Sequence, residues 1–217
     1  SENKYSKVSI NRKIASLKSY FNFLVNIGEL NSSPLKAHKN LKSSSKIVIP
    51  FTQTEINEVF NSFKFIEGNE RDKLIIELFY STGIRRDELL NIRINNIDFD
   101  NYLIKILGKR DKERIIPMLP KLSKNILNYI YKNYPSKFLF ESKKSRKLSS
   151  STIYRVINKY FRAVSSKVKV SPHVLRHTFA THMLNNGADI NTIKEILGHS
   201  SLSVSYTHLR AHETHLN

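Results

Sequence analysis

Residues 171–182 have the sequence SPHVLRHTFATH, and this run says the most about the fold. It predicts a helix with Ser171 as its N-cap and Pro172 at the first helical position, where a missing N–H costs nothing. His173 then falls in the first turn, beside backbone donors that favour an anion. Arg176 follows one turn later on the same face, so its planar guanidinium can meet the same anion. The run therefore predicts phosphate chemistry at the start of a helix.

The composition indicates which phosphates are bound. The chain of 217 residues has 36 Lys and Arg against 18 Asp and Glu, and its formal net charge of +18 is spread along the sequence. This charge indicates either nucleic acid or an anionic membrane as partner. No apolar run approaches the roughly 20 residues of a membrane span, and no apolar signal segment precedes the first charges. We therefore expect a soluble, intracellular protein whose partner is a nucleic acid and no membrane.

The sequence contains no cysteine. Disulfides, thiolate nucleophiles and cysteine-ligated zinc or iron–sulfur sites are therefore excluded.

The N-terminal part predicts one helix followed by a basic linker. Ser9 can cap a helix that continues to about Ile27, with apolar residues at helical spacing and Gly28 as its stop signal. One amphipathic helix cannot bury its own apolar stripe, so this piece is interpreted as the remnant of a larger helical unit. Residues 36–46 are polar and basic, which places a domain boundary near residues 46–50. The other sides of the helix carry three candidate DNA-binding residues, Arg12, Lys13 and Lys18.

The middle of the chain predicts helices interrupted by a small sheet. Helices are expected from Thr52 or Thr54 to about Phe63, and from about Asn69 to Gly83. The stretch 97–117 changes period around the sequence GKRDK, which predicts a hairpin or a small antiparallel sheet. The fold class is therefore mainly α with a small antiparallel β-sheet.

A later helix, over residues 151–164, carries a basic stripe. Arg155, Lys159 and Arg162 stand at i, i+4 and i+7, opposite the apolar residues of the same helix. The stripe suits contacts with the DNA backbone, and a solvated charged face explains it equally well.

Four more segments carry residues suited to phosphate chemistry. The motif TGIRRDELL places Arg85 just after a glycine turn at a helix start, and Lys109 lies at the expected hairpin tip, where it can deliver a proton. The motif LGHSSL ends a helix at Gly198 and exposes His199 just after it. Tyr206 offers a phenol seven residues beyond His199. Taken alone, an arginine or lysine in such a place is more often a solvated surface residue.

Together these segments resemble the tyrosine recombinase family, close to its Xer-type and phage-integrase members, from Phe51 to His208. The resemblance rests on TGIR at 82–85 with EL at 88–89, GK at 108–109 with KER at 112–114, HVLRHTFAT at 173–181, LGHS at 197–200 and YTH at 206–208. It implies a partial helical core-binding domain that clamps DNA over residues 1–46, a tyrosine-recombinase catalytic domain over 47–208, and an atypical tail over 209–217.

The resemblance also implies a mechanism and a set of roles. The activating residues are Arg85, Lys109, His173, Arg176 and His199, and Tyr206 is the nucleophile. The tyrosine attacks a scissile phosphodiester and forms a 3′-phosphotyrosine bond, while the arginines and the second histidine stabilise the nonbridging oxygens. The lysine protonates the departing 5′-oxygen, and the first histidine takes or orients the tyrosine proton. Arginines stand where magnesium stands in other phosphoryl-transfer enzymes, so neither a cofactor nor a metal is expected.

The implied activity is site-specific recombination of double-stranded DNA, for chromosome-dimer resolution or for mobile-element integration and excision. The implied assembly is a tetramer of protomers on two DNA sites, in the cytoplasm at the nucleoid.

Three alternative functions share some of these features. His173 and His177 have the i, i+4 spacing of a helical zinc pair, but Val174 stands where a zinc-protease helix has its glutamate, and Arg176 would repel a cation. A type IB topoisomerase shares the tyrosine and arginine chemistry, but the motifs read as Xer-like. The third is a catalytically inactive DNA-binding protein of the same fold.

The C-terminal spacing bears on this third alternative. Tyr206 stands two residues nearer to His199 than the family pattern has it, and two residues turn a helix by about 200°. His208 occupies the expected position of the nucleophile.

Overall fold

The computed structural model describes residues 5–42, 48–63, 69–108, 113–142, 146–167 and 169–198. The chain divides into two compact units, Ser1–Ile47 and Val48–Asn217. Lys109, His199, Tyr206 and the expected tail lie outside the described residues.

Over residues 5–42, the first unit contains one helix and a segment that returns along it. Helix α1 (Lys7–Asn26) has Ser6 as its N-cap, whose side chain accepts from the backbone N–H of Ser9, so the expected start at Ser9 is wrong. Both serines satisfy the capping pattern, and the helix takes the earlier one. The side chain of Asn11 exchanges hydrogen bonds of 2.9 Å with the backbone of Leu41. No residue of α1 is buried.

Local capping signals set the helix ends of the second unit. Thr52 forms a capping box with Glu55 at the start of α2, and Gly83 ends α3 in the left-handed conformation. Both helices lie where the sequence predicts them. The helices of this unit are α2 (Gln53–Ser62), α3 (Glu70–Thr82), α4 (Arg86–Leu90), α5 (Pro120–Asn133), α6 (Ser150–Val164), α7 (Pro172–Asn185) and α8 (Ile190–Leu197).

A three-stranded antiparallel sheet interrupts the helices, as expected for the stretch 97–117. Its strands are β1 (Ile97–Asp98), β2 (Leu103–Leu107) and β3 (Glu113–Pro117), in the order β1-β2-β3. Ile104 pairs with Ile116, and Ile106 pairs with Arg114. All three isoleucines are buried, so this face of the sheet meets the core. Arg114 stands two residues before Ile116 and therefore shares the core-facing side.

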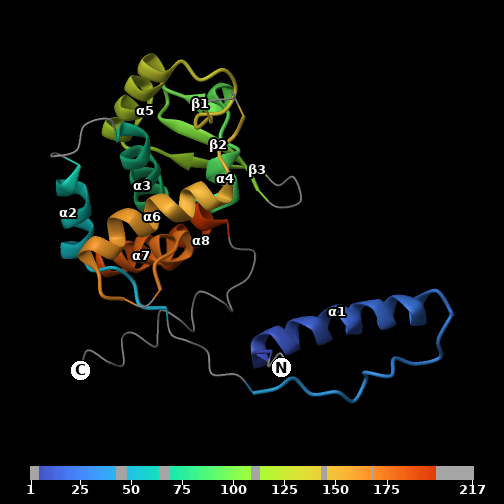
Figure 1. Ribbon diagram of the computed structural model, residues 1–217. Coiled ribbons are helices and arrows are strands. Elements are labelled where there is room, and N and C mark those ends of the chain that lie inside the picture. Colours follow the sequence, from blue (N-terminus) through green and yellow to red (C-terminus); the bar gives the residue numbers. More distant parts are fainter. Residues whose placement is uncertain are drawn as a thin grey trace. The chain divides into compact units, whose positions relative to one another are not determined.

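The core of the second unit is built around α3, which packs against α5, α6 and α7 (Figure 1). Its residues Ile75, Leu78 and Phe79 are completely buried. Helix α8 packs on α7 through a smaller apolar cluster that includes Phe179 and Leu197. Helix α7 therefore packs against both α3 and α8. Among the described residues, no helix has the length and apolar content that a membrane span requires.

Candidate functional site

The start of α7 has the predicted form. Ser171 is the N-cap and its side chain accepts from the N–H of Val174, Pro172 lies in the first turn, and His173 is exposed. Arg176, one turn later, is only 7% exposed. Its guanidinium donates to the Gly83 carbonyl over 2.5 Å and to the Leu197 carbonyl over 2.7 Å. Arg176 therefore joins the end of α3 to the end of α8, and His173 faces solvent beside it.

Arg85, at the start of α4, also reaches the end of α8. It is the N-cap residue of α4, and its side chain is 39% exposed. Its Nη1 donates to Glu88 Oε1 over 2.9 Å, and its Nη2 donates to the Gly198 carbonyl over 3.0 Å. Because Arg176 bonds the neighbouring Leu197 carbonyl, the structure brings the two arginines together at the end of α8.

Gly83 allows α7 and α8 to pack closely at the end of α3. Its φ of +58° lies in the left-handed region, and a Cβ at this position would overlap the Phe179 ring and lie 2.7 Å from Leu197 Cδ2. Glycine is needed here both for the turn before Arg85 and for the close packing of α7 and α8. Steric constraints thus explain why glycine occupies this position of the TGIR motif.

Two further residues complete the cluster, and sequence reasoning gave neither of them a role. Glu88 is 6% exposed and accepts from both terminal nitrogens of Arg114, at 2.6 and 2.7 Å. Arg114 also donates from Nε to the Ile196 carbonyl over 3.1 Å. A signal was available for Arg114, because a charged residue at a core-facing position of a strand needs a buried partner.

The end of α8 is consequently surrounded by arginines. The carbonyls of Ile196, Leu197 and Gly198 accept from Arg114, Arg176 and Arg85 respectively. The last carbonyls of a helix have no intrahelical partner and carry the negative end of the helix dipole, so guanidinium groups stabilise them. Gly198, in the left-handed conformation, directly precedes His199 in the sequence.

The cluster holds more positive than negative charge. Burial opposes ionisation of Glu88, but hydrogen bonds from Arg114 and Arg85 lower its pKa to about 2. Burial, followed by the charge of Arg85, lowers the pKa of Arg176 to about 9, so this arginine stays charged at neutral pH. Three guanidinium groups around one carboxylate leave a net positive charge, which favours an anionic ligand such as a phosphodiester.

The expected DNA-binding residues of α6 are exposed on one side of that helix. Arg155 donates to Thr152 over 3.2 Å, Arg162 donates to Asn158 over 2.7 Å, and Lys159 lies 3.3 Å from the Tyr160 hydroxyl. These bonds are local to the helix and leave the stripe accessible to a ligand.

The three candidates on α1 differ from one another. Arg12 and Lys13 are exposed, and the ammonium of Lys13 lies 3.5 Å from the centre of the Tyr5 ring. Lys18 is half-buried and donates to the His38 carbonyl over 2.7 Å, so it also holds the returning segment.

No group of three or more His, Asp or Glu side chains that could hold a metal ion occurs within the part of the chain that the structure describes. His182 lies within the fold, 3.0 Å from the Tyr80 hydroxyl, and burial lowers its pKa.

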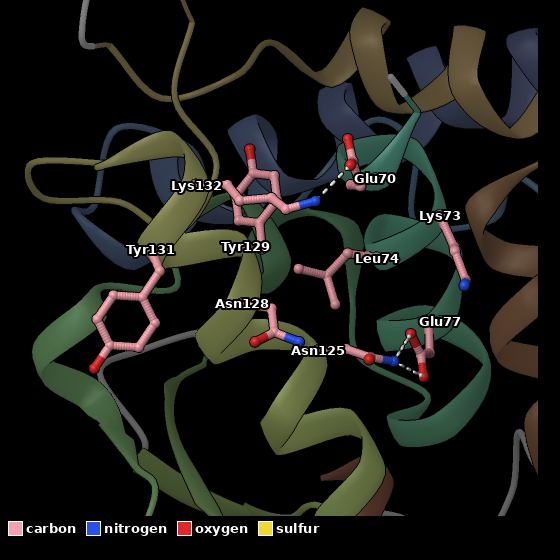
Figure 2. A pocket seen from close by; sticks show the side chains of 9 residues that line it. All are labelled: Glu70, Lys73, Leu74, Glu77, Asn125, Asn128, Tyr129, Tyr131 and Lys132. Carbon is pink, nitrogen blue, oxygen red and sulfur yellow. Dashed lines mark hydrogen bonds and ion pairs between the residues drawn. The ribbon is translucent and has the colours of Figure 1, made fainter. Parts of the chain in front are cut away.

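A cavity of about 420 Å³ lies apart from these residues, between α3 and α5 (Figure 2). Leu74 and Tyr129 line it, and Asn125 donates to both oxygens of Glu77. Burial raises the pKa of Glu77 in spite of this bond. None of the arginines around α8 lines the cavity, so the positive cluster is the better candidate for phosphate chemistry.

Comparisons with known proteins agree on one family. The model of the phage integrase family matches residues 50–213. A tyrosine recombinase of Pseudothermotoga lettingae is 36% identical over 209 residues, which cover 95% of this chain and 71% of that protein. The crystal structure of XerA recombinase matches with a TM-score of 0.67 and 27% identity, over 98% of this chain and 77% of that one. The Tn1549 transposon integrase, in complex with transposon right end DNA, has a TM-score of 0.76 at 19% identity, over 99% of this chain and 81% of that one, and supports the fold alone.

Proposed function

The chain belongs to the phage integrase family of tyrosine recombinases, and from this premise we propose that it cuts and rejoins DNA at specific sites through a 3′-phosphotyrosine intermediate. One observation carries the proposal. Arg85 and Arg176 come from distant segments and meet at the end of α8, immediately before His199 in the sequence. Two guanidinium groups at one place suit the two nonbridging oxygens of a phosphodiester.

The cleavage step follows from these groups. The Tyr206 oxygen attacks the phosphorus and the bond to the 5′-oxygen breaks, so the phosphate keeps its bond to the 3′-oxygen and exchanges the 5′-oxygen for the tyrosine oxygen. The phenol proton goes to His173, and Lys109 gives a proton to the departing 5′-oxygen. Arg85, Arg176 and His199 neutralise the charge that grows on the nonbridging oxygens. To contact the phosphate, Arg176 exchanges a hydrogen bond with the Gly83 or Leu197 carbonyl for one with a phosphate oxygen. The reverse step, with a 5′-hydroxyl from a second duplex, makes the recombinant strand without an external energy source.

The DNA-bound assembly has four protomers. Exchange between two duplexes cuts four strands, and each chain supplies one Tyr206. We therefore propose a tetramer on two DNA sites, which acts in the cytoplasm at the nucleoid.

The two units have different roles on the DNA. Residues 1–46 clamp the duplex as part of a core-binding domain, residues 47–208 carry the catalytic residues, and 209–217 form a separate tail. The backbone contacts come from Arg12, Lys13, Lys18, Arg155, Lys159 and Arg162. To contact the DNA backbone, Lys18 must exchange its hydrogen bond with the His38 carbonyl for one with a phosphate.

The test is covalent capture of the chain on DNA. A binding site is first selected from random duplexes, and the chain is then incubated in EDTA with a nicked duplex that carries the selected site, so that cleavage cannot be reversed. We expect a covalent protein–DNA adduct that maps to Tyr206 and is lost in Tyr206→Phe. Tyr154→Phe, which changes an exposed tyrosine of α6, is the matched control and should keep the adduct. Sequence-specific binding without any adduct would instead show an inactive DNA-binding protein.

A further inference from the structure

Arg114 lies where three segments of the cluster meet. From β3 it bonds both carboxylate oxygens of Glu88 in α4 and the Ile196 carbonyl at the end of α8. We propose that Arg114 is a positioning residue for DNA cleavage, which fixes Arg85 and the turn before His199 relative to each other. This inference rests on the proposed function, since it assigns Arg114 a part in that same reaction.

Arg114 and Arg85 differ in what their guanidinium groups bond and in how exposed they are. The side chain of Arg114 is 13% exposed and that of its partner Glu88 is 5% exposed, whereas Arg85 is 39% exposed. Nε and both terminal nitrogens of Arg114 bond groups inside the protein, whereas the more exposed side chain of Arg85 can reach a phosphate in solvent. Both arginines bond the same Oε1 atom of Glu88, so the position of one depends on the other.

The bonds of Arg114 require the shape of a guanidinium. Its two terminal nitrogens meet the two carboxylate oxygens side by side, and Nε meets a carbonyl from a different helix. A lysine ammonium is a single point of charge and cannot hold three acceptors in this planar arrangement. Charge alone therefore does not replace Arg114.

The turn that leads to His199 closes against the Arg114 side chain. A Cβ on Gly198 would lie 3.1 Å from Arg114 Cδ and 3.3 Å from its Nε and Nη1, and the φ of Gly198 is +63°. The left-handed turn at Gly198 and the position of Arg114 thus fit each other closely. A change at Arg114 removes the support on which this turn rests.

Loss of Arg114 should act on Arg85 as well. A buried carboxylate keeps its charge only with bonded cations, so Glu88 would draw the Arg85 guanidinium inward in place of Arg114. The same group would then be less available for a phosphate. The expected effect is a slower chemical step at saturating DNA, with little change in DNA affinity, because the phosphate contacts elsewhere remain.

The test compares Arg114→Met and Arg114→Lys with the wild-type chain and a matched control. Lys105→Met is the control, because Lys105 forms an exposed ion pair of 2.8 Å with Glu113 across the same hairpin. The probe is the nicked duplex with the site that the wild-type chain selects. Three quantities are measured: the single-turnover rate of adduct formation at saturating DNA, the Kd for the duplex, and hydrogen exchange of a peptide covering residues 190–198.

We expect both Arg114 variants to lose about 100-fold in rate, because misplacement by about 1 Å can cost this much. Their Kd should stay within threefold of wild type, exchange in 190–198 should rise, and Lys105→Met should behave as wild type. A wild-type rate in Arg114→Lys, or equal losses of rate and affinity in both variants, overturns the positioning role and leaves the proposed function intact. If the wild-type chain forms no adduct, the proposed function fails for this chain. The exchange data then decide alone: increased exchange in Arg114→Met supports the positioning of α8, and unchanged exchange refutes it.

Discussion

At the scale of single residues, the site depends on how arginine and glycine differ from their closest substitutes. The guanidinium of Arg176 spans two carbonyls from helices far apart in sequence, and Gly83 leaves the space that the side chains of Phe179 and Leu197 occupy. Arg176 depends on the planar shape of its guanidinium as well as on its charge, and Gly83 depends on its lack of a side chain as well as on its flexibility. A conservative replacement at either position therefore has a measurable cost.

Gly83→Ala should lower the free energy of unfolding by roughly 2–5 kcal/mol, the sum of a left-handed alanine and an overpacked contact. The cost arises from φ +58° and from the overlap with Phe179. Urea denaturation of the variant measures it. Gly187→Ala is the matched control, because φ is +84° there and no atom lies within 4 Å of the added Cβ. Equal losses in the two variants would show that packing at Gly83 is unimportant.

The ion pair between Glu55 and Lys167 should make stability depend on acid pH. Burial opposes ionisation of Glu55, but hydrogen bonds from Lys167 and Ser165 lower its pKa from 4.5 to about 2. A carboxyl with a depressed pKa contributes stability above its unfolded-state pKa and loses it as pH falls through the folded value. We therefore expect wild-type stability to fall between pH 4.5 and 2, with Glu55 supplying on the order of 2 kcal/mol of the loss.

The measurement is the free energy of unfolding as a function of pH for wild type and Glu55→Gln. The variant should be less stable at neutral pH and should show a shallower slope between pH 4.5 and 2. Glu58→Gln removes one charge from the exposed side of the same helix and serves as the control. Parallel curves for wild type and Glu55→Gln would contradict the assignment.

At the scale of elements, α6 presents one apolar and one basic side. Ile153, Val156 and Phe161 are buried, while Arg155, Lys159 and Arg162 are exposed. A helix fixed in the core through one side holds the opposite side in a constant position, which suits contacts with a regular DNA backbone. A charged surface that only contacts solvent has the same geometry, so a measurement of DNA affinity has to distinguish the two interpretations.

Replacing the three basic residues of α6 by glutamine should raise the Kd for DNA about tenfold or more, because each phosphate contact contributes to affinity. Replacing Lys121, Lys124 and Lys132 of α5 by glutamine removes the same charge from another helix. Fluorescence anisotropy with one duplex at one salt concentration compares the two variants. If the α5 variant loses as much affinity as the α6 variant, the stripe acts only through net charge.

Element ends were largely predictable because capping is local. Thr52, Gly83, Ser171 and Gly198 each mark a helix end within a few residues of sequence, and the structure confirms all four. The start of α1 was misplaced because two serines three residues apart fit the same pattern.

The network of Glu88 and Arg114 could not be predicted in this way. These residues are 26 positions apart, and their contact depends on how β3 packs beside α4. The burial of Arg176 has the same origin, since the spacing within α7 places it near His173 but says nothing of the carbonyls that α3 and α8 bring to it.

At the scale of the whole molecule, charge is the dominant feature. The chain carries +18, and its basic residues occur in both units, on α1 as well as on α6. A polyanion such as DNA releases counterions when a protein of this kind binds, so the affinity depends on salt. The arginine cluster at α8 contributes only a small part of this charge. DNA affinity therefore depends mainly on other basic residues, whereas catalysis depends on the cluster.

DNA binding by the wild-type chain should therefore weaken steeply with salt. A protein that contacts about six to ten phosphates loses about 10³–10⁵ in affinity between 50 and 200 mM salt, and the logarithm of the binding constant falls linearly with the logarithm of salt concentration. Titrations in sodium chloride measure the slope, and sucrose at equal osmolality is the control, because it changes water activity without competing for phosphates. Arg176→Ala should keep nearly the full slope, since its guanidinium is buried and many other basic residues contact the backbone. A slope near zero for the wild-type chain would contradict an electrostatic mode of binding, and a large reduction in Arg176→Ala alone would mean that the cluster at α8 dominates binding as well as cleavage.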